Sequence, residues 1–183
     1  MNWSRNRFLQ TMMIGTPAMA GGSKMNQLQN MFSSEALAEI WNISGDLALE
    51  FADAMPAEYY DYRPVDNDEL YTYAGQMLHI AQNSNGLMGS YITGKEPPKI
   101  PESAEGQSKD SIMAALRDAF DFGRQVIAEQ TPESLIEEVE FFAGPLPRWH
   151  VIFIAQDHTA HHIGQSVIYL RAKGITPPSY RKW

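Results

Sequence analysis

Four long stretches with helical spacing of apolar residues, separated by segments rich in proline and glycine, constrain this chain most. The spacing predicts helices from Ser33 or Ser34 to Met55, from about Asp66 to Tyr91, from Ser108 or Ser111 to about Ile127, and from Arg148 to Lys173. Apolar side chains three and four residues apart fall on one helix face, which must pack against another element. Proline lacks an amide hydrogen, so the proline-containing segments between these stretches end the helices.

The connecting segments carry little sign of a sheet. Thr131-Pro132-Glu133 predicts one short extra helical turn, since proline fits the first helical position. Residues Glu137 to Phe142 could form a short extended segment, but no stretch alternates convincingly between apolar and polar residues. We therefore expect an all-α fold, a four-helix bundle of up-and-down helices joined by long crossover loops.

Composition narrows the function classes. A chain of 183 residues is long enough to bury a core as one domain. Its net charge of −8, from 14 basic and 22 acidic residues, argues against nucleic acid as the main partner. The absence of cysteine excludes disulfides, a thiol nucleophile and cysteine-bound zinc or iron–sulfur clusters.

The N-terminal segment differs from the rest in charge. Residues 1–34 contain Arg5, Arg7 and Lys24 but no acidic residue. A basic start, the mildly apolar run 8–20 and small residues at its end are typical of an export signal. The run is too short to span a membrane, so we expect no stable membrane insertion. We expect 1–25 to be an export signal or a disordered arm and 26–183 to be the bundle domain, exported to the periplasm in the first case and cytoplasmic in the second.

Histidines carry the strongest functional pattern. His158 and His162 lie four residues apart, on one face of the last helix, a spacing at which two imidazoles can bind one metal ion. His79 is the candidate third ligand, provided that the second and fourth helices are neighbours. Small and polar residues share its face, which favours a cavity. The candidates to orient substrate or water around the histidines are Gln76, Asn83 and Gln165.

Spacing alone leaves other interpretations open. A lone histidine on a polar helix face is usually hydrogen-bonded or exposed, and His-x-x-x-His is a weak motif. His161 is rotated by roughly 100° from the face of its neighbour and is a poorer ligand candidate. Thr159 stands where the zinc-protease motif requires glutamate, so that class of enzyme is excluded.

The chain resembles the DinB-like family, also called the DinB/YfiT-like metalloenzymes, from about Asn26 to Tyr180. Four features carry the resemblance: the stretch after the first helix, the histidine of the second helix, the histidine motif of the last helix and the C-terminal tail. In this sequence they are Ala57–Pro64, Gln76–Ile80, Asp157–Gln165 and Tyr169–Tyr180. Ile163 stands where the family often has arginine.

The resemblance implies that His79, His158 and His162 form a metal triad in a four-helix bundle that is often a homodimer. Some members are thiol transferases or thiol-dependent isomerases that use a low-molecular-weight thiol. Zinc and nickel both suit three imidazoles, with iron or manganese as further candidates. Because the chain has no cysteine, any thiol must come from a small-molecule cosubstrate.

We therefore expect a mononuclear metal-dependent enzyme, a transferase or hydrolase that activates a metal-bound thiol or water toward a small-molecule substrate. No general base or other catalytic residue is assigned. One alternative is a non-catalytic metal-binding or interaction module of the same fold. Another is a bundle whose histidines are simply packed.

Overall fold

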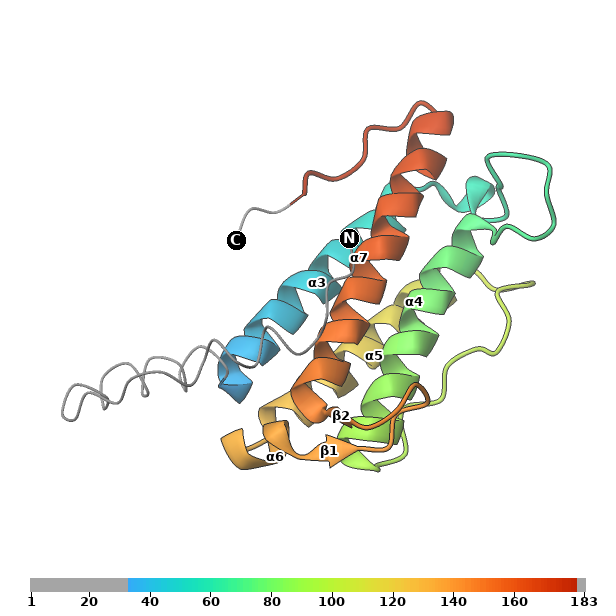
Figure 1. Ribbon diagram of the computed structural model, residues 1–183. Coiled ribbons are helices and arrows are strands. Elements are labelled where there is room, and N and C mark those ends of the chain that lie inside the picture. The colour runs from blue at the N-terminus through green and yellow to red at the C-terminus, as the bar shows by residue number, and fades with distance from the viewer. Residues whose placement is uncertain (1–32, 181–183) are drawn as a thin grey trace, which may run out of the picture. The chain divides into compact units, whose positions relative to one another are not determined.

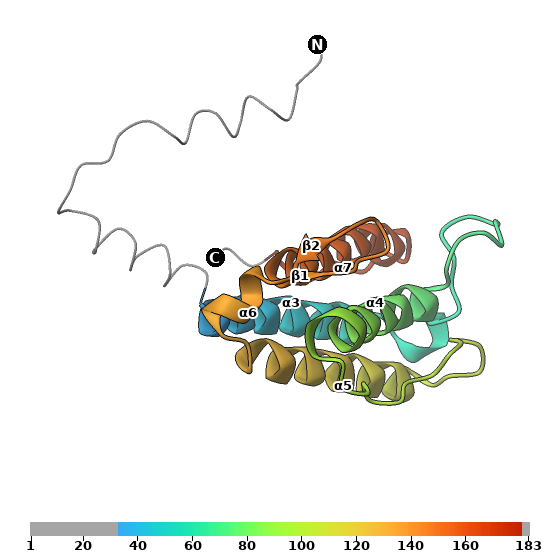
Figure 2. The ribbon, with the colours of Figure 1, turned by 60° about the horizontal axis from the view of Figure 1, so that its bottom comes forward.

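Four long helices form the bundle in the computed structural model, which describes residues 33–180 (Figure 1). They are α3 (Ser34–Ala54), α4 (Tyr73–Leu87), α5 (Lys109–Ala128) and α7 (Arg148–Ala172). The all-α fold predicted from the sequence is confirmed. Viewed toward their ends, the four helices pack around a common core (Figure 2). The predicted export signal or arm lies outside the described residues.

Side-chain caps explain where α3 and α5 begin. Ser33 accepts a hydrogen bond from the amide of Ala36, and Ser108 accepts one from the amide of Ser111. Each bond satisfies an amide that has no partner inside the helix. The predictions for α3 and α5 are therefore confirmed, with Ser33 and Ser108 as the capping residues.

The predicted start of the second helix is wrong. α4 begins at Tyr73 rather than near Asp66, because Thr72 caps it by accepting from the amide of Gly75. In the preceding loop the Asn67 side chain accepts from the amide of Glu69, a local bond that competes with helix formation. At the other end, the helix continues as a π-helical segment, η2 (Met88–Thr93), and Gly94 ends it with φ of 68°.

The shorter elements lie in the connections between the long helices. A 3₁₀ turn, η1 (Ala57–Tyr59), follows α3, and α6 (Pro132–Ile136) forms the predicted short turn. The extended segment is confirmed as β1 (Glu138–Val139), which pairs antiparallel with β2 (Leu146–Pro147). Among the described residues, no helix combines the length and apolar character needed to cross a membrane.

Close packing fixes α3 against α5. The indole nitrogen of Trp41, which is fully buried, donates to the carbonyl of Phe120 at 2.9 Å. A Cβ atom at Gly123 would lie 2.4 Å from the Trp41 ring, so only glycine allows this approach. The remaining two helices, α4 and α7, run antiparallel beside each other (Figure 1). They are therefore the neighbours that a shared histidine site requires.

Candidate metal centre

Three histidines meet between α4 and α7. His79 comes from α4, His158 and His162 from α7, and one ligand atom from each lies within 4.8 Å of the others. The Nε2 atoms of His79 and His158 are 3.1 Å apart. Two ring nitrogens that face each other at this distance share either a proton or a cation. Two nitrogens bound to one zinc ion, each at about 2.0–2.1 Å, lie roughly 3–3.5 Å apart, so the observed separation fits a common ion.

Burial keeps these imidazoles neutral. It lowers the pKa of His158 to about 4, helped by the neighbouring His79 and His161 against a weaker opposing effect of Asp157. The pKa of His162 is also lowered to about 4, mainly by burial and then by the other histidines. Burial lowers the pKa of His79 as well. The neutral ring keeps a lone pair available, which is the form that binds a metal ion.

Gln76 orients His162. The side-chain oxygen of Gln76 lies 2.7 Å from Nδ1 of His162, and an amide oxygen can only accept, so Nδ1 carries the proton. The lone pair of His162 is therefore on Nε2, the atom left for a metal ion. Gln76 is almost fully buried, so its other bonds must also be made within the protein.

A hydrogen-bond chain extends outward from Gln76. Its side-chain nitrogen donates to Oε1 of Gln165 at 2.9 Å, and Nε2 of Gln165 donates to Nε2 of His161 at 2.7 Å. The Gln76 nitrogen also lies 3.4 Å from the hydroxyl of Tyr169, which donates to the backbone carbonyl of Tyr71. These bonds fix the amide of Gln76 and, through it, the ring of His162.

The His158 side of the centre lacks such bonds. Nδ1 of His158 and Oδ1 of Asn83 are both buried without a hydrogen-bond partner. Asn83 lies one turn beyond His79 on α4, and helical side chains lean toward the N-terminus of their own helix.

Tyr71 covers one side of the centre, and the sequence analysis missed it. Its ring stacks on the His79 ring at 5.0 Å with an interplanar angle of 27°, and lies 6.5 Å from the His162 ring. Tyr71 precedes the α4 cap in a loop, and no periodic pattern predicts where a loop side chain points. The sequence offered no signal for this contact.

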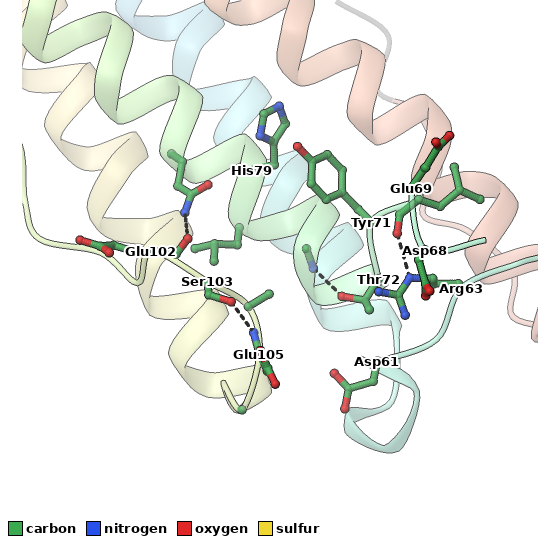
Figure 3. Close-up of a pocket in the computed structure, with 16 residues that line it drawn as sticks. Asp61, Arg63, Asp68, Glu69, Tyr71, Thr72, His79, Glu102, Ser103 and Glu105 are labelled. Atoms are coloured by element: carbon green, nitrogen blue, oxygen red, sulfur yellow. Dashed lines mark hydrogen bonds between the residues drawn. The ribbon is translucent and has the colours of Figure 1, made fainter. Parts of the chain in front are cut away.

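A cavity of about 620 Å³ opens beside the centre (Figure 3). His79 and Tyr71 lie at one end, and Asp61 and Glu105 lie at the other. Two loops complete the walls, 61–72 and 102–106. The volume is in the range of sites that hold small molecules, about 300–1,000 Å³.

The predicted residues differ in how far the structure brings them together. His79, His158 and His162 form the cluster, and Gln76 and Gln165 are hydrogen-bonded around it. Asn83 lies one turn beyond His79 on α4, and its Oδ1 accepts no hydrogen bond. Their roles as ligands and orienting groups stay predictions. Outside the cluster, His150 stacks on Trp149 with ring centroids 5.2 Å apart, and His161 is exposed, as its rotated position indicated.

A model of the DinB family matches residues 25–182. The chain belongs to the DinB family. That assignment agrees with the four-helix bundle and with a three-histidine cluster compatible with metal binding, as expected for a family associated with metal ions. No curated protein matches this DinB protein in sequence.

Two solved structures share the fold of this DinB protein. One is a DinB-like protein from Bacillus cereus, with a TM-score of 0.67 and 19% identity over 80% of this chain and 97% of that one. The other is the DinB-like protein YjoA from Bacillus subtilis, with a TM-score of 0.65 and 17% identity over 80% of this chain and 98% of that one. At such identities the likeness concerns the fold.

Proposed function

We propose that this DinB protein is a mononuclear metal-dependent enzyme, with His79, His158 and His162 as the ligands of one divalent ion. The observation that carries the proposal is the meeting of three neutral imidazoles between two antiparallel helices, with two Nε2 atoms 3.1 Å apart. Without a metal, one of the two rings must donate its Nε2–H to Nε2 of the other, whereas a shared ion is bound by the lone pairs of both.

The donor set favours zinc or nickel, because imidazole suits both ions, with iron and manganese as weaker candidates. Among the described residues, the cluster has three members, whereas structural zinc sites are usually closed by four protein ligands. Three protein ligands leave room for water or substrate. A bound ion of this kind lowers the pKa of water or of an incoming thiol and so supplies a nucleophile at neutral pH.

The surrounding amides hold the ligands in position. Gln76 keeps the proton of His162 on Nδ1, and Gln165 keeps the Gln76 amide from rotating. We propose that Asn83 does for His158 what Gln76 does for His162, with Oδ1 of Asn83 accepting from Nδ1 of His158. Both atoms are buried and unpartnered, and Asn83 lies one turn beyond His79 on the same face of α4.

The reaction is suggested by the resemblance to the DinB family, some of whose members use a low-molecular-weight thiol, and the cavity and the composition are compatible with it. The cavity beside His79 admits a small molecule, and the chain has no cysteine to serve as its own nucleophile. The proposed activity is transfer of a low-molecular-weight thiol, or hydrolysis by water, at the metal. Export of the chain and formation of a homodimer remain separate proposals.

Stripping the metal and adding it back tests this function. Chelator-treated protein is reloaded with zinc or nickel and assayed for thiol transfer to chlorodinitrobenzene and for hydrolysis of nitrophenyl acetate. We expect turnover to depend on the ion and to be lost in His158→Ala, while His150→Ala, a histidine of the same helix outside the cluster, behaves like the unmodified chain. If added metal raises only the melting temperature and neither assay responds, a non-catalytic metal-binding module is the better description.

A further inference from the structure

Tyr71 brings a hydroxyl to the edge of the histidine centre. Its ring stacks on the His79 ring, and Figure 3 shows the hydroxyl end directed toward the His79 imidazole. We infer that Tyr71 is a catalytic residue, whose hydroxyl donates a hydrogen bond to the small molecule bound beside the three histidines. The inference rests on the proposed function for the ion at the centre, and it adds a group that contacts the molecule reacting there.

The Tyr71 ring lies close to two of the three histidines. Its centroid is 5.0 Å from that of His79 and 6.5 Å from that of His162, and the centroids of these two imidazoles are 4.7 Å apart. Its plane is tilted by only 27° from that of His79, the geometry of an offset stack. Tyr71 also lines the cavity, so a molecule that reaches the centre from the cavity passes this ring.

The hydroxyl of Tyr71 makes no hydrogen bond with any residue in the described part of the chain. The other two hydroxyls that line the cavity are engaged, since Thr72 caps α4 and Ser103 accepts from a backbone amide of its own loop. The side-chain amides of Gln76 and Gln165 are bonded to each other. Tyr71 is therefore the cavity hydroxyl that remains open to a molecule bound at the centre.

The protein holds Tyr71 in this position. The Tyr169 hydroxyl donates to the backbone carbonyl of Tyr71 at 2.7 Å, and Nε of Arg63 donates to the carbonyl of the residue before it at 2.8 Å. A Cβ atom at Gly75 would lie 3.2 Å from Cβ of Tyr71, tighter than side chains usually pack. Glycine, one turn before His79, thus leaves the space for the Tyr71 side chain against α4. A side chain held in advance loses little freedom when a ligand binds.

A hydroxyl at this position favours anionic ligands of the centre. Water or a thiol that gives up a proton leaves a negatively charged atom with lone pairs that can still accept a hydrogen bond. Hydrogen bonds to a charged acceptor are about twice as strong as those between neutral groups. Imidazole binds an ion through its one basic lone pair and keeps none to accept from a hydroxyl. The Tyr71 hydroxyl should therefore strengthen the binding of azide or a thiol and leave that of imidazole unaffected.

The variant Tyr71→Phe tests this difference, because it removes the hydroxyl and keeps the stacked ring. Cobalt-loaded protein is titrated with azide, 2-mercaptoethanol and imidazole, each followed through the visible absorption of the ion. We expect the affinities for azide and 2-mercaptoethanol to fall about tenfold, equivalent to about 1.4 kcal/mol, and the affinities for imidazole and for cobalt to stay the same. Tyr59→Phe, at an exposed tyrosine outside the cavity, should change none of the four.

Several outcomes overturn the inference. Equal losses for all three ligands would reveal a change in shape rather than a lost hydrogen bond, and no loss for any of them would mean that the hydroxyl does not reach the bound molecule. A large fall in cobalt affinity would make Tyr71 a ligand of the ion instead. The proposed function fails separately, if cobalt-loaded protein shows the expected pattern but no turnover. If the unmodified chain takes up no cobalt, both fail together.

Discussion

The two α7 histidines of the centre sit in contrasting surroundings. His162 is joined through Gln76 to Gln165, and Gln76 also approaches Tyr169, so its ring orientation and its tautomer are both fixed. His158, one turn away, faces His79 but has a buried Nδ1 with no partner. On one side of the centre hydrogen bonds within the protein hold the ligand, and on the other a buried donor candidate, Nδ1 of His158, and a buried acceptor, Oδ1 of Asn83, have no partner.

The contrast shows how a metal site can be only partly preorganised. A hydrogen bond that already holds a ligand side chain in the metal-free protein stabilises the fold. A hydrogen bond that forms only in the metal-bound protein increases the metal affinity alone. We therefore expect Gln76, the hydrogen-bond partner of His162, to influence both stability and metal binding, and Asn83 on the His158 side to influence metal binding only. Three predictions address this difference.

Lowering the pH should produce the largest loss of stability, because it protonates both His158 and His162. In the unfolded chain the imidazoles have the ordinary pKa of 6.5, whereas in the fold those of His158 and His162 are lowered to about 4. The unfolded state binds more protons between these values, so the free energy of unfolding of metal-free protein falls as the pH drops from 6.5 to about 4.

Urea denaturation at several pH values in this window measures that loss. His158→Ala and His162→Ala should flatten the pH dependence by similar amounts, and His150→Ala should not. A slope that survives both replacements would place the titrating groups elsewhere.

Replacing Gln76 should come next in size. Gln76→Ala removes the acceptor of a buried imidazole N–H, which typically costs about 1–3 kcal/mol in the free energy of unfolding. Metal affinity should fall about 10–100-fold, as it does when such a supporting group is lost. Denaturation of metal-free protein and competition with a chelator measure the two effects. Gln125→Ala, an exposed glutamine on α5, serves as control and should show neither effect.

The smallest effect is expected from Asn83. Asn83→Ala removes no hydrogen bond from Oδ1 in the metal-free fold, so the free energy of unfolding should change by no more than about 0.5 kcal/mol. Metal affinity should fall about tenfold, because Nδ1 of His158 loses its acceptor in the bound form. A stability loss as large as that of Gln76→Ala would remove the distinction between the halves.

Helical periodicity explains which parts of the fold and of the histidine site could be predicted from the sequence. It gave the face shared by His158 and His162, and it placed Gln76 and Asn83 one turn on either side of His79. Capping serines marked the starts of α3 and α5. All of these are local relations, set within one helix by its fixed rise and rotation.

Relations that depend on loops could not be predicted. The stretch around Asn67 resembles a helix start, but its local side-chain bond keeps it in a loop and leaves Thr72 to cap α4. The position of Tyr71 over His79 depends on that loop's path. The carboxylates around the cavity come from two such loops, so their convergence appears only in three dimensions.

Elemental analysis of the purified protein tests the central claim most directly. The protein is incubated with zinc or nickel, freed of excess ion and measured for bound metal, beside His158→Ala and His150→Ala. We predict about one ion per chain for the unmodified protein and for His150→Ala, and a large loss for His158→Ala. No bound metal, or an equal amount in His158→Ala, would contradict the three-histidine metal centre.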